Sequence, residues 1–363
     1  MRLRTPTFAR NFACLGSLCR ENCCIGWEID IDPETAARYM ALPGTLGDRL
    51  RAAIREEDGV YSFKLDEKER CPFLNSHNLC DIQCELGHEA LCQICRDHPR
   101  FCGVFDDLCE KGPGLCCEAA ARDMLQEEGP LLFEETDMPP LPSPPLNADE
   151  KARLSWLLPR RESLFTLLQD HTRPLSPRLK EACTFCVQVQ ETLDGGPLPN
   201  DSERIPDAPS YIAALLTLLS TCESLGPSWD SALQQMKNVG LAKHPAPTIN
   251  ELMQKAPWLS VAYEKLMVYT LFRYGLRAVF DGDFLSVWQQ ALLAAQTVFL
   301  LDLTVFLQNG NLTPETCIDH MGLWSRQMEY SDENLSVLQQ AFWQDVAFSP
   351  TNQLSFLPGY SFS

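Results

Sequence analysis

The chain has 363 residues, of which 45% are hydrophobic, and this composition is typical of a protein that folds around a buried core. Its formal net charge is −19, and so acidic a chain would repel a phosphate backbone, because nucleic-acid binding draws its affinity from Lys and Arg. We therefore expect neither nucleic acid nor an anionic membrane as a partner. A cationic surface that carries lysines would instead be attracted.

The N-terminal residues and the most apolar stretch of the chain both bear on the cellular location of the protein. Residues 1–10 include basic side chains, but no apolar run of the kind that a secretory signal requires follows them. The most apolar stretch, residues 291–307, is interrupted by Gln296 and Asp302 and is short for a bilayer span. It predicts a buried helix, and we expect a cytoplasmic protein.

The first 130 residues contain short alternating segments. Residues 27–32 and 61–65 alternate apolar and polar side chains, which predicts two half-buried strands that could pair as a small antiparallel sheet. Asp32 and Pro33 are typical of a helix N-terminus, and residues 36–57 predict one or two helices broken near Pro43. These segments predict a small α+β module.

Five prolines between Pro139 and Pro145 exclude a helix or a central strand there. We therefore expect a proline-rich linker over residues 131–150, between a cysteine-rich domain of residues 1–130 and a helical domain of residues 151–363. No fixed repeat joins the helical segments, so the pattern favours an irregular bundle with a loop at 195–209, and the fold class is α+β, mostly α. The expected helices are 153–169, 178–193, 211–225, 261–280 and 284–308, with two more that begin at Thr313 and Ser331.

Seventeen cysteines are present, and 13 of them fall between Cys14 and Cys117. In a reducing compartment such density indicates metal binding more than disulfides. Thiolates are soft ligands that suit both zinc and iron–sulfur clusters. Cys92 and Cys95 form a Cys-x2-Cys half-site, in which one tight turn aims both sulfurs at the same centre. The alternative is a set of buried apolar cysteines.

The remaining cysteine patterns favour structural roles. Cys183 and Cys186 also spell Cys-x2-Cys, but they share the apolar stripe of an expected helix, which favours a place in the core. Four cysteines recur every seven residues, yet the prolines and glycines between them exclude one continuous helix, and we interpret the spacing as accidental: Cys95, Cys102, Cys109 and Cys116.

Other polar side chains near the cysteines have two interpretations. Glu28, Asp30 and Asp32 could form an acidic entrance for a lysine on one side of a strand, although a solvated strand face is the favoured interpretation. Three histidines could replace a sulfur ligand, although ordinary surface or hydrogen-bonding histidines are favoured: His77, His88 and His98. No Gly-rich loop of the dinucleotide-binding kind is present, and the sequence assigns no catalytic base.

Five cysteine motifs follow one another in residues 8–122: Phe12-Ala-Cys14-Leu-Gly-Ser-Leu-Cys19, Cys23-Cys24-Ile-Gly-Trp27, Cys71-Pro-Phe-Leu74, Leu79-Cys80-Asp-Ile-Gln83 and Cys92-Gln-Ile-Cys95-Arg96. Taken in this order they resemble the bacterial flagellin lysine N-methylase (FliB-type) family. The segment from Tyr263 to Tyr269 is similar to a helix in the C-terminal half of that family.

The resemblance implies methyl transfer from S-adenosylmethionine to surface lysines of flagellin, in a protein that carries an iron–sulfur cluster. A 4Fe–4S cluster is the expected type and zinc the alternative, since the cysteine order is also similar to small zinc- or iron-chelating domains. A non-enzymatic metal-binding or redox-sensing interaction protein is the other open function. On the basis of the resemblance, the expected ligands are Cys19, Cys23, Cys24, Cys71, Cys80 and Cys95, followed by Cys92 and Cys117.

Overall fold

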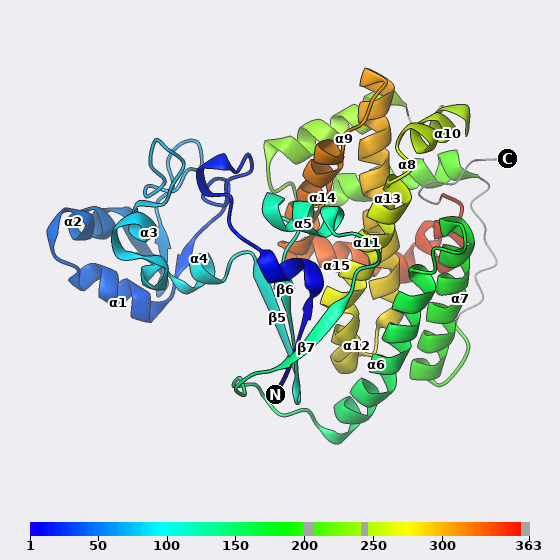
Figure 1. Cartoon of the computed structure of the whole chain (residues 1–363), viewed down its shortest axis with the longest axis horizontal. Coiled ribbons are helices and arrows are strands. Elements are labelled where there is room, and N and C mark those ends of the chain that lie inside the picture. The colour runs from blue at the N-terminus through cyan, green and yellow to red at the C-terminus, as the bar shows by residue number, and fades with distance from the viewer. Residues whose placement is uncertain (199–206, 241–245, 357–363) are drawn as a thin grey trace.

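The computed structural model of the chain describes residues 1–198, 207–240 and 246–356. A small lobe, which we call the cysteine lobe (residues 12–99), projects from a larger helical bundle (residues 148–356), and the strands β5 and β6 lie between the two (Figure 1). Helices dominate and the strands are short, which confirms the expected α+β, mostly helical class.

The cysteine lobe is built around a three-stranded antiparallel sheet in the order β2-β4-β3. Ile31 pairs with Tyr61, which confirms the pairing expected for the two alternating segments, and on the other side of β4 Ile54 pairs with Phe63. The elements of the lobe are β2 (Asp30–Ile31), α1 (Pro33–Ala41), α2 (Gly44–Ala53), β3 (Ile54–Glu57), β4 (Val60–Phe63), α3 (Asp81–Leu86) and α4 (Gln93–Asp97).

Local sequence explains where these elements begin and end. Asp32 Oδ1 accepts a hydrogen bond from the Thr35 amide at 2.9 Å, so the expected N-cap of α1 is confirmed. The expectation that residues 54–57 are helical is wrong. Asp58 and Gly59 both have positive φ angles and form the tight turn of a hairpin, which pairs residues 54–57 with β4 instead.

A second, mixed sheet of four strands in the order β5-β6-β1-β7 lies against the bundle. Strand β1 runs parallel to β6 and antiparallel to β7. Its strands, none of which the alternation in the sequence predicted, are β1 (Arg2–Pro6), β5 (Arg100–Phe105), β6 (Leu108–Pro113) and β7 (Phe133–Asp137). Helix α5 (Glu118–Gln126) follows β6, and β7 lies within the expected linker of residues 131–150.

Buried side chains group the chain into two cores. Phe8, Leu108, Leu115 and Met124 belong to the same core as the bundle helices, although they lie within residues 1–130. The cysteine lobe has a separate core, formed by residues between Ile29 and Cys92. The domain boundaries at 130 and 150 stay a prediction.

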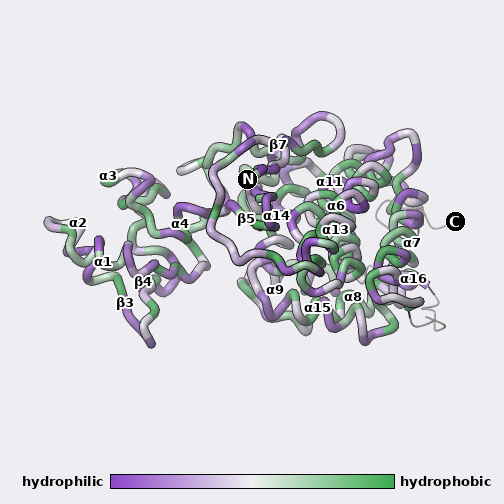
Figure 2. The backbone as a smooth tube through the Cα atoms, turned by 90° about the horizontal axis from the view of Figure 1, so that it is seen from below, coloured by the Kyte–Doolittle hydropathy of each residue, from purple (hydrophilic) through white to green (hydrophobic). Residues whose placement is uncertain are grey.

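Helix α13 runs through the middle of the bundle (Figure 2) and contacts α11, α14, α7 and α9. It is long and apolar enough to cross a bilayer, but 83% of its most apolar window is buried inside the protein, which confirms the buried helix expected at 291–307. The bundle helices are α6 (Ala148–Leu168), α7 (Leu175–Asp194), α8 (Ala208–Thr221), α9 (Pro227–Val239), α10 (Ala246–Lys255), α11 (Leu259–Tyr274), α12 (Ala278–Asp281), α13 (Phe284–Asn309), α14 (Pro314–Glu329), α15 (Asp332–Gln344) and α16 (Pro350–Gln353).

The expected helices of the bundle are confirmed with small shifts of their ends, whereas α9, α10 and α16 were not predicted. The segment expected at 261–280 divides into α11 and α12, which a short 3₁₀ turn at 275–277 separates. Most of the loop expected at 195–209 lies outside the described residues, and its last two residues begin α8.

A candidate cysteine-lined site

The expected ligands converge where the cysteine lobe meets the bundle. One cavity of about 260 Å³ is lined by six of the eight: Cys19, Cys23, Cys24, Cys80, Cys95 and Cys117. Cys14 and Cys116 also line it, and Arg326 of α14 forms part of its wall. The other two expected ligands, Cys71 and Cys92, are buried in the adjoining core of the lobe. Most of the thiols that we expected to share one centre therefore line the same cavity.

Short helices and backbone hydrogen bonds position these thiols. The Cys71 amide donates to the Cys24 carbonyl at 2.8 Å, which joins two segments far apart in the sequence. Cys80, Cys92 and Cys117 are the N-cap residues of α3, α4 and α5. The backbone N–H groups at these helix starts favour the thiolate, but burial outweighs them at Cys80 and Cys117 and raises the pKa of both thiols.

The pKa values of the thiols are split within each close pair. A hydrogen bond from Cys24 lowers the pKa of Cys23 to about 7, and the pKa of Cys24 is raised in turn. Cys95 likewise lowers the pKa of Cys92 while its own pKa rises. Burial raises the pKa of Cys71 to about 11. A bound cation would offset the cost of burying these thiolates, and its binding would release protons.

In the part of the chain that the structure describes, no three Cys, His, Asp or Glu side chains are grouped closely enough to hold one metal ion. The structure therefore does not show a metal site. In an iron–sulfur cluster the irons and bridging sulfides stand between the ligand sulfurs, so its ligands lie farther apart than those of a single ion. Thiols from several segments line this one cavity, and cysteine thiolates are ligands of both zinc and iron–sulfur clusters.

Two of the three histidines near the cysteines, His88 and His98, line the cavity, whereas His77 does not. His98 lies against the rings of Trp27 and Tyr330, with centroids 6.3 and 6.4 Å away. Burial lowers the pKa of His98 to about 4, so its imidazole is neutral at neutral pH.

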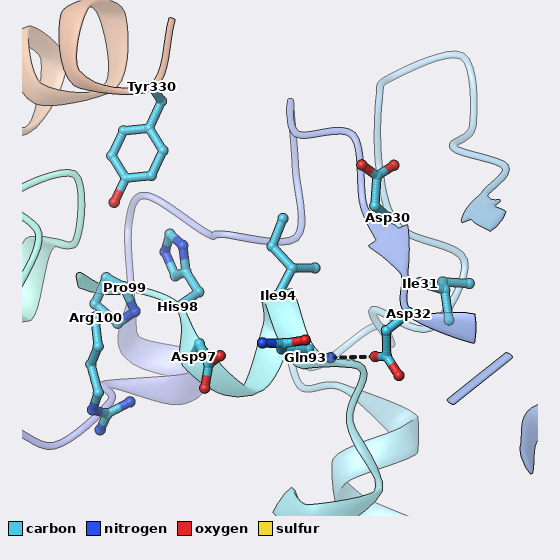
Figure 3. A pocket seen from close by; sticks show the side chains of 10 residues that line it. All are labelled: Asp30, Ile31, Asp32, Gln93, Ile94, Asp97, His98, Pro99, Arg100 and Tyr330. Carbon is cyan, nitrogen blue, oxygen red and sulfur yellow. Dashed lines mark hydrogen bonds between the residues drawn. The ribbon is translucent and has the colours of Figure 1, made fainter. Parts of the chain in front are cut away.

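A second hollow of about 460 Å³ lies beside the cysteine cavity, with Asp30 and Asp32 on one wall and Tyr330 and His98 on the other (Figure 3). Asp32 also accepts a hydrogen bond from the Gln93 amide at 2.9 Å, marked in Figure 3. Although partial burial opposes ionisation, this bond and the cap of α1 hold the pKa of Asp32 below its usual value. The Asp32 carboxylate thus already has two structural partners.

The third carboxylate of the expected acidic entrance, Glu28, does not line this hollow. It accepts a hydrogen bond from Arg55 Nη2 of β3 at 2.5 Å instead. Of the three carboxylates, only Asp30 lines the hollow without a hydrogen-bond partner for its side chain among the described residues. This outcome agrees better with a structural strand face than with an acidic entrance.

Charged side chains tie the cysteine lobe to the bundle. Arg20, next to Cys19, donates to Glu118 of α5 at 2.9 Å and to Asp319 of α14 at 2.7 Å. Glu21 pairs with Arg326 of α14. The wall of the cysteine cavity is therefore shared between segments about 300 residues apart in the sequence. The contribution of α14 to this site was not predicted, because no local motif marks it.

The segment at Tyr263 that resembles a family helix supplies buried polar contacts within the bundle. The Tyr263 hydroxyl donates to Asp302 at 2.8 Å, and Glu264 accepts from Arg178 Nη1 at 2.5 Å. Lys265 is buried and donates to main-chain carbonyls at and after the end of α5. These three neighbours hold α11 to the elements around it.

Comparison with known proteins bears on this C-terminal part. Residues 208–355 match the family model described as the FliB lysine N-methylase C-terminal domain. This part of the chain is similar to the C-terminal domain of the FliB lysine N-methylase family. The match confirms the resemblance that the cysteine motifs suggested, although the matched residues contain none of the expected ligands.

Three relatives carry names that agree with this family. Lysine-N-methylases of Salmonella choleraesuis and Salmonella typhimurium are each 30% identical, over 145 and 138 residues, which cover 36% of this chain and 34% of each relative. The flagellar biosynthetic protein FliU of Salmonella muenchen is 27% identical over 143 residues, 36% of this chain and 80% of FliU. The matches thus span about a third of the length of the two lysine-N-methylases. No solved structure matches the chain.

Proposed function

We propose that this protein is a cytoplasmic, S-adenosylmethionine-dependent lysine N-methyltransferase that modifies surface lysines of flagellin and carries a cysteine-ligated iron–sulfur cluster. The observation that carries the proposal is the cavity in which six of the expected cysteine ligands meet Arg326 of α14, a helix of the FliB-type domain. The names of the relatives, lysine-N-methylase and flagellar biosynthetic protein, support the activity and the flagellar substrate.

The cavity residues suit a cluster. Cys80 and Cys117, at helix N-termini, together with Cys24 and Cys95 would hold it from four different segments. Arg326 lines the cavity and offsets part of the negative charge that several thiolates bring. A bound cluster would supply iron that can take a polar ligand or exchange an electron. The surrounding thiols and side chains would shield it from water.

The protein's charge suits a lysine-bearing partner. A net charge of −19 attracts a cationic surface and speeds the encounter. The lysine ammonium, with an ordinary pKa near 10.4, has no lone pair and must lose a proton before it can take a methyl group. A proton acceptor on the protein is therefore required.

The experiment combines composition with activity. Anaerobically purified protein should contain iron and sulfide and absorb in the visible range, and it should transfer labelled methyl groups to flagellin lysines that mass spectrometry can locate. Replacing Cys92 and Cys95 together with serine should remove the iron and the label. The matched control replaces Cys183 and Cys186 with alanine. This pair has the same spacing but lies in the core of the bundle, so its loss should leave the iron in place.

An intact cluster without any label on flagellin would contradict the enzyme. It would favour the alternative, a non-enzymatic redox-responsive protein, which one contact supports. Cys102 Sγ lies 3.3 Å from Cys109 Sγ across the β5–β6 hairpin, so two of the cysteines whose regular spacing we interpreted as accidental are neighbours. Zinc without iron or sulfide would contradict the cluster.

A further inference from the structure

The FliB-type domain has a cavity of its own, apart from the cysteine cavity. Helices α9, α13 and α14 enclose about 460 Å³ that opens to the surface. Serine, glutamine and threonine side chains alternate with apolar ones around it, and the groups that matter for the argument are Ser231, Gln235, Leu301, Thr304, His320 and Leu323.

A histidine and a buried carboxylate meet at the wall of this cavity. His320 Nδ1 of α14 lies 2.5 Å from Asp302 Oδ1 of α13. The other oxygen of Asp302 accepts the hydrogen bond from Tyr263 of α11 at 2.8 Å. The Asp302 side chain is completely buried, whereas 13% of the His320 side chain is exposed. Three helices therefore converge on one carboxylate, which in turn orients one imidazole.

This arrangement fixes the tautomer of His320. Because Nδ1 donates its proton to Asp302, the neutral ring carries its lone pair on Nε2, at the other edge of the ring. Nε2 makes no hydrogen bond with any residue in the ranges 1–198, 207–240 and 246–356. A buried carboxylate is costly unless it is paired, and Asp302 meets this condition through His320 and Tyr263.

We propose that His320 is the general base of the methyl transfer, with Asp302 and Tyr263 as positioning residues and the cavity as the site for the substrate lysine. The inference rests on the proposed function. One proton passes from the lysine Nζ to His320 Nε2, which leaves a neutral amine and an imidazolium stabilised by Asp302. The methyl donor supplies the carbon: the nitrogen–carbon bond forms with the amine lone pair as the carbon–sulfur bond breaks, and sulfur keeps that electron pair.

The cavity suits a lysine side chain. Leu301 and Leu323 offer apolar surface to its methylenes, while Ser231, Gln235 and Thr304 offer polar groups near the amine. None of the described residues that line the cavity is Lys or Arg, so the ammonium meets no like charge.

The other titratable groups around His320 are few in the described structure. Asp302 from α13 and Tyr263 from α11 have been named, and Cys317 of α14 also faces Asp302. The residues that α9 contributes to the cavity, Ser231 and Gln235 among them, do not titrate.

The test measures initial rates of labelled methyl transfer to purified flagellin between pH 6 and 10. His320→Gln should lower the rate about 100-fold or more near neutral pH, which is the usual contribution of a general base. The deficit should shrink toward pH 10, because the lysine then loses its proton to water. A merely structural role would not produce this convergence.

The matched control is His171→Gln. His171 Nε2 lies 2.8 Å from the buried Glu264, so it is also a histidine paired with a buried carboxylate, but it does not line the cavity. It should keep the wild-type rate and pH profile. Asp302→Asn should lower kcat at least tenfold with little change in KM, because an asparagine no longer holds the Nδ1–H tautomer.

A further variant keeps the proposal testable if His320→Gln fails to fold. Ser231 is exposed on α9 at the cavity, and Ser231→Trp should raise the KM for flagellin without lowering the melting temperature. Wild-type rates in His320→Gln at every pH, or equal losses in both histidine variants, would overturn the base. Wild-type protein with an intact cluster that does not methylate flagellin would overturn the proposed function, and the base with it.

Discussion

The cysteine lobe and the helical bundle are stabilised in different ways. The core of the lobe has 14 buried residues, two of them cysteines, and its helices have at most ten residues. So small a core is marginal without a staple such as a metal or disulfides. The bundle is built on the 26-residue helix α13, most of whose side chains are buried. We infer that the lobe depends on its thiols binding a metal centre, whereas the bundle folds without one.

The buried polar groups of the bundle and of the cysteine lobe also differ. In the bundle, Glu264 and Asp302 are completely buried, and each accepts hydrogen bonds from two side chains. In the lobe, the buried cysteines Cys71 and Cys92 adjoin the cavity that other thiols line. Buried groups with good partners define a unique packing, and the proposed metal centre would give the thiols such partners.

The largest expected effect is therefore on the lobe, when thiols that are proposed to hold the metal centre are replaced. Replacing Cys24 and Cys95 together with serine should abolish hydrogen-exchange protection across residues 29–95 and leave protection of α13 unchanged. Structural zinc contributes about 10 kcal/mol or more in small metal-binding peptides, which exceeds the total stability of most small domains. Hydrogen exchange followed by mass spectrometry measures both regions in one sample.

The control for this experiment is Cys84→Ser. Cys84 is an exposed cysteine of the same lobe that does not line the cavity, so its loss should change nothing. Equal protection of the lobe in the wild type and in the double variant would show that its apolar core suffices, and the contrast with the bundle would disappear.

The two regions also differ in how far sequence alone predicts them. The bundle helices follow from periodic apolar residues and from local stop signals such as Gly195 and Gly310, whose αL conformations end α7 and α13. The mixed sheet was missed because its strands pair across long sequence separations. Arg2 pairs with Leu108 and Asp137, and no pattern within the five residues of β1 reveals strands more than 100 positions away.

The residues of the candidate site also differ in how far the sequence predicts them. The resemblance of the cysteine motifs to a known family predicted six of the thiols around the cavity, and each of these motifs is a short local segment. Arg326 and Tyr330 were missed, since they belong to α14 and its end. His320 and Asp302 were not recognised as a pair either, because they are 18 residues apart on different helices and meet only through packing.

A smaller effect is expected from the buried ion pair between the mixed sheet and the bundle. Arg161 of α6 is fully buried and donates to Glu110 of β6 at 2.8 Å. Arg161→Met leaves the Glu110 carboxylate with Arg4, 3.7 Å away, as its only remaining cation among the described ion pairs. We expect the free energy of unfolding to fall by about 3 kcal/mol, the lower end of the range for breaking a buried pair.

Urea unfolding of the bundle, followed by circular dichroism, measures this change. Lys151→Met is the control, because Lys151 forms its ion pair with Asp106 at 3.0 Å near the surface, and such pairs contribute about 0–1 kcal/mol. If both variants lost the same stability, burial of the charge would not matter at Glu110. Exchange protection of the lobe should be the same in both variants.

The smallest effect is expected at Asp32, which joins α1 to α4 within the lobe. Asp32→Ala removes the cap of α1 and the acceptor for the Gln93 amide, and it should cost about 1 kcal/mol of local stability. The pKa of Asp32 is lower in the folded protein than in the unfolded chain, so its carboxylate stabilises the lobe above the unfolded pKa of about 4. This contribution is lost as the pH falls through the folded pKa.

The difference in lobe opening between the wild type and Asp32→Ala, measured by hydrogen exchange, should therefore be full at pH 7 and shrink as the pH falls below about 4. Asp30→Ala is the matched control, because Asp30 lies two residues earlier on the same wall of the hollow, and its side chain accepts no hydrogen bond from the described residues. A loss as large in Asp30→Ala would show that the charge of the strand matters rather than the two hydrogen bonds. In that case the acidic face, and not the cap, would be what couples α1 to α4.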